Sequence, residues 1–307
     1  MMLDQLLQQV FNGVALGSVY ALIALGYSMV YGILEMLNFA HGEIFMSGAF
    51  LGWIVLSMTL GGTGGWLPPW VGLGLALLLA SGGAALLGAA VEVLAYRPLR
   101  RASRLSPLLS ALGVSIFLQN VVMLATGARV KIYPVERFFP SGLGLILGEV
   151  TLPAVKVFVL GVSLILMILL DLLVRKTRLG RAMRATAEDS EAAAYQGISP
   201  QRIITLTFLL GSALAGIAGV LVGLYYGQID FFMGFSAGMK AFTAAVLGGI
   251  GNLRGAMLGG LILGLAESLG VAFIEPVYKD VIAFTLLVLA LLLRPSGLLG
   301  KQVAEKV

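Results

Sequence analysis

The segment RKTRLGRAMRATAEDSEAAAYQGISPQR, residues 175–202, decides how this chain folds, because it is a long charged stretch between long apolar runs. It contains six basic and three acidic residues. In a membrane protein, a large charged loop of this kind is usually kept on the cytoplasmic side. We therefore interpret this polar segment as a cytoplasmic loop, which a soluble partner could contact.

The rest of the chain is too apolar for a water-soluble protein. Of its 307 residues, 59% are hydrophobic and 11% are charged, and the mean hydropathy is +0.99. A soluble domain carries about 25% charged residues, so the bilayer must act as the solvent for much of this surface. The composition predicts an all-α integral membrane protein, a polytopic helical bundle that forms a single transmembrane domain over residues 1–307.

Apolar runs long enough to cross about 30 Å of hydrocarbon divide the chain into membrane segments. The predicted spans cover residues 6–34, 44–60, 70–95, 105–126, 154–174, 203–226 and 281–293. A Gly-rich stretch at residues 237–273 adds either two crossings, with a break near residues 248–252, or one re-entrant excursion. We therefore expect eight or nine membrane segments, with Gly-rich re-entrant or broken segments among them.

The 41 glycines lie mostly inside these runs, and several are four residues apart, such as Gly13 and Gly17 or Gly260 and Gly264. Small residues at this spacing let helix backbones approach closely in lipid. We favour close helix packing over flexible loops as the role of these glycines.

The basic residues predict which ends of the spans face the cytoplasm. The net charge is +5, and four, six and three of the 20 Lys and Arg residues lie in residues 97–104, in the polar segment and in the C-terminal tail. The positive-inside rule accounts for this distribution without nucleic acid. It places these segments and the C-terminus inside, and counting back three spans from residues 97–104 places the N-terminus outside.

The longest outer loop, residues 127–153, carries charged residues together with Tyr133, Phe138 and Phe139. It is either a solvated loop or a docking surface for an external partner.

A weak internal similarity aligns residues 42–52 with residues 249–259. Many transporters contain two related halves with the substrate site between them. The matches are glycines, alanines and leucines, which are common in this chain, so they indicate either a repeat or chance.

Nothing in the sequence resembles an enzyme site, a metal site or a cofactor site. The chain has one histidine and no cysteine, which excludes disulfides and thiol chemistry. It has no G-x-x-x-x-G-K-[ST] phosphate loop, so we expect that this chain does not hydrolyse ATP by itself.

Polar residues gather between the first two spans, in the sequence Asn38-Phe-Ala-His41-Gly-Glu43. Polar groups at membrane depth are costly unless they face a cavity or a partner. Asn38, His41 and Glu43 are therefore candidates for lining a translocation path. The alternative is a short cytoplasmic turn, in which Asn38 caps the next helix and Glu43 lies in its favourable first turn.

Three further charged residues fall inside or near apolar runs. Glu92 lies about one helical turn from Arg97, which predicts a position at the cytoplasmic edge. Lys240 and Glu267 are candidates for buried polar contacts on the substrate path, or for positions at the membrane interface.

The polar segment contains the signals of one short helix. Thr186 followed by Asp189 fits an N-terminal capping box with Glu188 in the first turn, and Gly197 suits the position after the last turn. A solvated connector is one interpretation of this helix. However, Ala and Tyr at residues 192–195 make it apolar enough to enter a groove on a partner.

Three stretches resemble a known family of transport proteins. Glu191-Ala192-Ala193, followed after three residues by Gly197, resembles the EAA…G cytoplasmic motif of ABC importer permeases. Residues 12–52 and 238–268 resemble the branched-chain amino acid permeases of the LivH type, and the resemblance covers nearly the whole chain.

The resemblance implies that this chain is the integral-membrane permease subunit of an ABC importer in the plasma (inner) membrane. Such a permease pairs with a second, related permease, so a heterodimer is expected, and with two ATP-binding cassette subunits that bind the ATP. A periplasmic or lipid-anchored binding protein delivers the substrate. By this resemblance the chain is not an enzyme, needs no cofactor of its own, and contacts membrane lipid but no nucleic acid.

The resemblance also implies how ATP hydrolysis is coupled to transport. In this family, a short cytoplasmic helix lies in a groove of the ATPase and transmits its movement. Carried over to this sequence, the coupling helix contains Thr186, Glu188, Asp189, Glu191, Ala192, Ala193 and Gly197.

The implied substrates are leucine, isoleucine and valine. Urea, short amides or other amino acids are the alternative for a permease of the same type. A secondary transporter or channel that works alone would use charged residues within its spans for ion coupling. Few charges lie within the spans here, which disfavours this third hypothesis.

Overall fold

The computed structural model describes residues 2–60, 67–100, 102–103, 105–140, 142–147 and 150–300. Eight segments of this described chain are long and apolar enough to cross a membrane, which confirms the predicted all-α polytopic fold. The helices are α1 (Met2–Leu34), α2 (His41–Leu60), α3 (Pro69–Val91), α4 (Leu105–Thr126), α5 (Ala154–Lys176), α6 (Arg178–Glu188), α7 (Ser190–Tyr195), α8 (Pro200–Tyr226), α9 (Met233–Gly248), α10 (Leu253–Phe273) and α11 (Lys279–Leu293). Four of the basic residues that predicted the topology, Arg101, Arg104, Lys301 and Lys306, lie outside the described residues.

Short elements complete the fold. A π-helical turn, η1 (Glu92–Tyr96), and a 3-10 turn, η2 (Arg97–Leu99), continue α3 toward α4. Two small antiparallel sheets pair β1 (Lys131–Ile132) with β4 (Gln228–Ile229) and β2 (Gly144–Leu147) with β3 (Val150–Pro153). Two further 3-10 turns, η3 (Val135–Arg137) and η4 (Pro276–Tyr278), lie near β1 and before α11.

The bundle is held together by helices that pack through small residues. The most extensive contacts join α1 to α10 and α3 to α8. A Cβ atom added to Gly17 would lie 2.8 Å from the carbonyl oxygen of Gly260, so no larger residue fits between these backbones. Such close approach supplies the packing energy that the hydrophobic effect cannot supply between helices in lipid. The four-residue glycine spacing therefore serves helix packing, as predicted.

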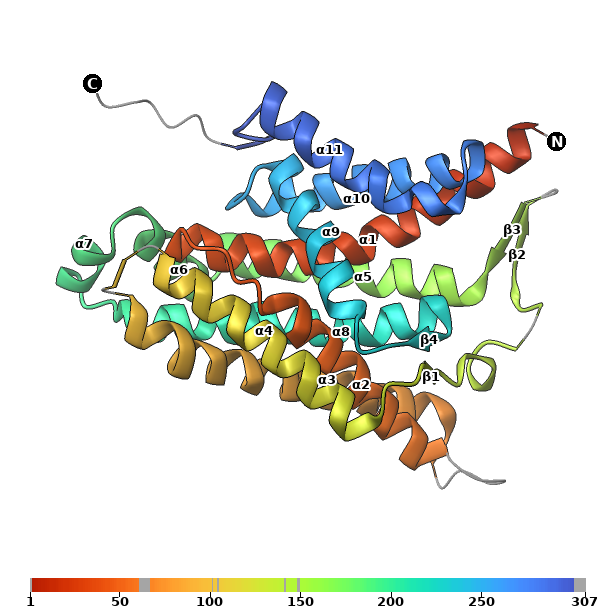
Figure 1. Cartoon of the computed structure of the whole chain (residues 1–307), viewed down its shortest axis with the longest axis horizontal. Coiled ribbons are helices and arrows are strands. Elements are labelled where there is room, and N and C mark those ends of the chain that lie inside the picture. Colours follow the sequence, from red (N-terminus) through yellow and green to blue (C-terminus); the bar gives the residue numbers. More distant parts are fainter. Residues whose placement is uncertain are drawn as a thin grey trace.

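Two helices, α2 and α9, begin inside the bundle. In Figure 1, the chain turns back from the end of α1 before α2 starts, and it turns back again after β4 before α9 starts. The two starting points touch, because a Cβ atom on Gly42 would lie 3.1 Å from the Cα atom of Gly238. α2 packs between α3 and α8, and α9 packs between α10 and α1, so the two halves of the chain resemble each other in arrangement.

This arrangement contradicts the alignment of residues 42–52 with residues 249–259. The first stretch lies in α2, and the second forms a turn and the beginning of α10. The fold makes α2 and α9 equivalent instead, because both begin at the centre of the bundle. Glycines at similar spacing misled the alignment, since they mark close packing in every part of this chain.

The Gly-rich stretch at residues 237–273 is broken where the sequence indicated. Gly249 and Gly251 adopt φ angles of 106° and 87°, which favour glycine, and the Asn252 side chain caps α10. α9 has 16 residues and is about 24 Å long, which is shorter than a full span. α9 runs from the centre of the bundle to one end. α10 and α11 then each cross the bundle, in opposite directions, as spans (Figure 1).

The two ends of the bundle differ. α6, α7, the α9–α10 turn and the described end of the chain gather at one end, and the N-terminus and the small sheets lie at the other (Figure 1). Hydrogen bonds from Leu298 N and Leu299 N to the carbonyls of Leu247 and Gly248, both 2.9 Å, fix the C-terminal segment beside the α9–α10 turn. The described basic segments therefore share one end, as their charge predicted.

The outer loop at residues 127–153 is not a simple solvated loop. Tyr133, Phe138 and Phe139 are buried, and the Tyr133 hydroxyl donates a hydrogen bond of 2.5 Å to the carbonyl of Ala49. Burial raises the pKa of Tyr133 well above its ordinary value, so the hydroxyl stays protonated as this donor. Tyr133 holds the loop against α2 and α8, and Phe139 packs on Trp70 of α3 and Phe158 of α5, so only the outer side of the loop is left for another protein.

Candidate functional site

The polar segment folds as two helices, where the sequence predicted one. Thr177 caps α6 through its Oγ1, which accepts a hydrogen bond of 3.1 Å from Gly180 N. Asp189 caps α7, because its Oδ1 accepts hydrogen bonds of 2.9 Å from the backbone N–H groups of Glu191 and Ala192. The predicted cap, Thr186, instead lies in the last turn of α6, where it is buried and donates to the Ala182 carbonyl.

The correction has a physical reason. Aspartate is a better cap than threonine, and residues 178–188 are mostly good helix formers that continue a helix past Thr186. As a result, Thr186 does not belong to the short exposed helix, and Glu188 ends α6 at its border.

α7 presents most of its surface to the outside of the protein. Ala193 is buried, whereas Glu191, Ala192 and Ala194 are exposed and Tyr195 is 91% exposed. Gly197 follows with a φ of 83°, the left-handed conformation expected of a residue just after a helix. Local hydrogen bonds cap both ends of this short helix, so its outward face is free to contact another protein.

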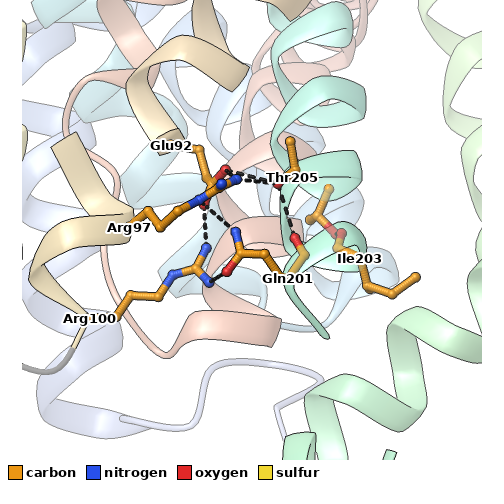
Figure 2. Close-up of polar contacts among 7 residues, drawn as sticks. Glu92, Arg97, Arg100, Gln201, Ile203 and Thr205 are labelled. Carbon is orange, nitrogen blue, oxygen red and sulfur yellow. Dashed lines mark hydrogen bonds and ion pairs between the residues drawn. The ribbon is translucent and has the colours of Figure 1, made fainter. Parts of the chain in front are cut away.

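The start of α8 is tied to the end of α3 by a buried carboxylate (Figure 2). Glu92 is fully buried, and its Oε2 accepts hydrogen bonds from Arg97 Nη2 and Thr205 Oγ1, both at 2.9 Å. Its Oε1 accepts from Arg100 Nη2 at 2.5 Å and from Gln201 Nε2 at 3.3 Å. Arg100 also donates to Gln201 Oε1 at 2.7 Å. We call Glu92, Arg97, Arg100, Gln201 and Thr205 the Glu92 clamp.

The clamp joins the helix that follows α7 to the spans behind it. Gln201 and Thr205 lie in the first two turns of α8. Burial lowers the pKa of Arg100, and the Glu92 carboxylate opposes this shift. The sequence placed Glu92 near Arg97, but it did not reveal the partners in α8, which are about a hundred residues away along the chain.

Asn38, His41 and Glu43 lie together at the centre of the bundle, each at most 2% exposed. Asn38 Oδ1 accepts a hydrogen bond of 2.9 Å from the Tyr96 hydroxyl, so it does not act as the side-chain cap that the turn hypothesis required. The His41 ring lies edge-on to Tyr27, with the ring centroids 4.8 Å apart. The segment does form a turn with Glu43 in the first turn of α2, but the turn is buried in the protein and Asn38 does not cap the helix as that alternative predicted.

These central residues are incompletely hydrogen-bonded. Among the described residues, Asn38 Nδ2, His41 Nε2 and Glu43 Oε2 have no hydrogen-bond partner. Buried polar atoms usually have one, so each unpaired atom requires an explanation. A molecule that enters from outside the chain is one source of the missing partners.

Lys240 and Glu267 form a separate group. Lys240 Nζ lies 3.0 Å from Glu267 Oε1 and 2.9 Å from Asp280 Oδ1, and Tyr20 donates a hydrogen bond of 2.9 Å to Glu267 Oε2. This cluster joins α9 to α1, α10 and α11 beside a cavity of about 370 Å³. The five residues expected on the substrate path therefore fall into two sites, and Lys240 is neutralised by carboxylates in the second.

Comparison with known proteins identifies the family. The family described as "Branched-chain amino acid transport system / permease component" matches residues 9–291 of the chain. The high-affinity branched-chain amino acid transport system permease protein LivH of Escherichia coli (strain K12) is 47% identical over 306 residues, which cover 98% of this chain and 97% of LivH.

Two further relatives extend the comparison. The permease protein BraD of Pseudomonas aeruginosa is 46% identical over 313 residues, covering 98% of both chains. The permease protein LivM of Escherichia coli (strain K12) is 33% identical over 153 residues, covering 48% of this chain and 35% of LivM. Because the family match includes nearly all of the helical bundle, the chain belongs to the permease components of branched-chain amino acid transport systems.

Proposed function

We propose that this chain is one of two permease subunits of an inner-membrane importer of leucine, isoleucine and valine, driven by ATP hydrolysis on separate subunits. The names of LivH and BraD, together with identities of 47% and 46% over nearly full length, favour branched-chain amino acids over urea or short amides. The likeness to LivM supports a second permease of related sequence as the partner.

The observation that carries the coupling proposal is the exposed helix α7. It has a buried alanine on one side, exposed Ala192, Ala194 and Tyr195 on the other, and acidic Asp189 and Glu191 at its cap and first turn. A short helix with a small apolar face is suited to a groove on a partner. We assign the groove to an ATP-binding cassette subunit, which places this end of the bundle in the cytoplasm and the N-terminus outside.

Movement of α7 would then pass into the membrane through α8. Gln201 and Thr205 at the start of α8 are hydrogen-bonded to Glu92. A displacement of α8 would therefore also move the end of α3. The opposite end of the bundle, which carries the small sheets, is where a substrate-loaded binding protein would dock.

The proposal is tested by reconstituting the chain with its second permease, two ATPases and binding protein in proteoliposomes. We expect ATP-dependent uptake of radiolabelled leucine and no uptake of urea. Uptake of urea in place of leucine would overturn the substrate. Leucine uptake by this chain alone, without ATPases, would favour a transporter that works by itself.

The coupling helix is tested separately with Gly197→Trp. The residue has a positive φ, so a tryptophan strains the end of α7, although the added Cβ atom itself has no neighbour within 4 Å. We expect ATP hydrolysis to continue while uptake falls at least about tenfold. Arg181→Trp, on the exposed side of α6, is the matched control and should keep uptake near the unmodified level. Unchanged uptake with Gly197→Trp would refute the assignment of α7.

A further inference from the structure

A cavity of about 270 Å³ lies between α2, α4 and α9, beside the point where α2 and α9 begin. Its walls are mostly apolar and include Phe39, Ile116, Phe232 and Phe235. Ligand pockets for drug-sized molecules measure about 300–1,000 Å³ and are lined mainly by apolar and aromatic side chains with a few polar groups. This cavity is slightly smaller, which suits a molecule of amino-acid size.

Glu43 supplies the charge in this cavity. Its side chain is 1% exposed, and its Oε1 accepts a hydrogen bond of 3.3 Å from Ser115 Oγ. Its Oε2 has no hydrogen-bond partner among the described residues, and the cavity lining contains no Lys, Arg or His. A buried carboxylate without a counter-charge is costly, and charged groups inside membrane proteins usually mark substrate pathways.

The backbone of α9 packs closely against the Glu43 carboxylate. Gly234, in the first turn of α9, lies against the Glu43 carboxylate, and any side chain added there would overlap it. The N-terminal ends of α2 and α9 both lie beside the carboxylate, where helix dipoles favour negative charge. Glu43 therefore lies in the wall of the cavity, and its Oε2 is enclosed between two helix N-termini without a hydrogen-bond partner among the described residues.

We infer that this cavity recognises the transported amino acid, with the Glu43 carboxylate binding its α-ammonium group and the aromatic walls receiving its branched side chain. This inference rests on the proposed import function, and it assigns recognition of the substrate's ammonium group to Glu43. A primary ammonium on a branched aliphatic chain supplies both the missing counter-charge and the apolar surface that the cavity accepts. Urea, which has neither, does not fit this description.

A single-cysteine reporter tests the inference in the complete reconstituted transporter. Because the chain contains no cysteine, Gln119→Cys gives it one thiol, at the wall of the cavity. We expect L-leucine to protect this thiol from a maleimide, and 3-methylbutylamine, which keeps the ammonium, to protect it as well. 4-Methylpentanoate, which lacks the ammonium, should give no protection. Ile116→Cys is a second reporter at the same cavity if Q119C does not assemble.

The role of Glu43 is tested by adding Glu43→Gln to the reporter. We expect the leucine concentration for half-protection to rise about tenfold or more, as for the loss of a charge-assisted hydrogen bond. Glu275→Gln, which changes an exposed carboxylate far along the sequence, should leave protection unchanged. Equal protection with and without Glu43→Gln, or equal protection by 4-methylpentanoate, would overturn the inference.

Uptake by the unmodified transporter separates this inference from the proposed function. If the unmodified transporter takes up no branched-chain amino acid, the proposed function fails, whatever the labelling result. If it takes up leucine but leucine protects neither reporter thiol, only the cavity inference fails.

Discussion

α7 and the beginning of α2 are both short polar regions at helix starts, but they differ in how far their hydrogen-bonding groups find partners within the chain. At α7, Asp189 satisfies two backbone N–H groups and the side chains face outward. At α2, the polar side chains face inward, and His41 and Glu43 each keep a buried atom without a hydrogen-bond partner among the described residues.

The difference indicates which kind of binding partner suits each region. An exposed helix whose end is already capped presents its side chains as a surface, and such a surface suits contact with another protein. A buried set of polar atoms that is incomplete offers individual hydrogen bonds, and these are recognised by a small molecule. Substitutions in the two regions should therefore have different consequences for folding and for transport.

The largest contrast should come from two glycines, Gly42 and Gly197. Gly42→Val would place a Cβ atom in overlap with the Gly234 carbonyl oxygen, and because the backbone cannot move aside, the cost exceeds the roughly 1–3 kcal/mol that is typical of overpacking. A Cβ atom added at Gly197 has no neighbour within 4 Å, so Gly197→Val mainly strains a positive φ, at roughly 1–2 kcal/mol. We expect Gly42→Val to abolish the folded permease and Gly197→Val to preserve it. Size-exclusion profiles after heating in detergent measure this, and equal profiles would remove the contrast.

Glu92→Ala should come next in size. Removing one partner of a buried ion pair costs about 3–5 kcal/mol, and the lower end applies here because Arg97 is 40% exposed and gains water. We expect Glu92→Ala to have a clearly lower melting temperature than the unmodified protein. Glu92→Gln should melt between these two temperatures because it keeps an acceptor for Arg100. Melting of Glu92→Gln at the temperature of the unmodified protein would mean that the carboxylate charge adds no stability to the clamp.

His41→Ala should affect transport more than assembly. The ring packs against Gly26 and Tyr27, and its removal leaves a cavity worth about 2 kcal/mol. We expect reduced leucine uptake, while the ATPase subunits still co-purify with the permease. Full uptake by His41→Ala would show that the buried histidine only fills space.

The smallest effect on overall stability should come from Asp189→Ala. Loss of the cap costs about 1 kcal/mol, and the cost is confined to α7. We expect the melting temperature to stay unchanged while uptake per ATP hydrolysed falls, because α7 frays. Asp189→Asn keeps a cap and is the control. A variant that loses stability but keeps its coupling would reverse the comparison between the two regions.

The spans were predictable because lipid imposes a simple rule on sequence. α4 has the predicted bounds, Leu105–Thr126, since its mostly apolar run contains no charged residue and ends before Gly127. α2 begins earlier than its apolar run because His41, Gly42 and Glu43 are polar and yet buried. Hydropathy cannot distinguish such buried polar residues from a surface loop, since the difference depends on the other helices around them.

α6 was missed, although a signal for it exists. Leu179, Ala182, Met183 and Thr186 follow the spacing of one helix face, and Met183 and Thr186 are buried. The many arginines hid this pattern. The partners of Glu92, Lys240 and Glu43 could not be predicted in the same way, because each pairing depends on how separate helices cross rather than on any local pattern.

The π-helical turn Glu92–Tyr96 connects the two regions that this comparison separates. Glu92 accepts a hydrogen bond from Thr205 in α8, the helix that follows α7. Tyr96, four positions later, donates a hydrogen bond to Asn38 at the centre of the bundle. A π-helical turn contains one residue more than an α-helical turn, and each residue of an α-helix turns the chain by about 100°. Deleting one residue from this turn would rotate Tyr96 away from Asn38 while Glu92 stayed in place. The extra residue therefore sets the angle between the side chain that holds α8 and the side chain that holds Asn38.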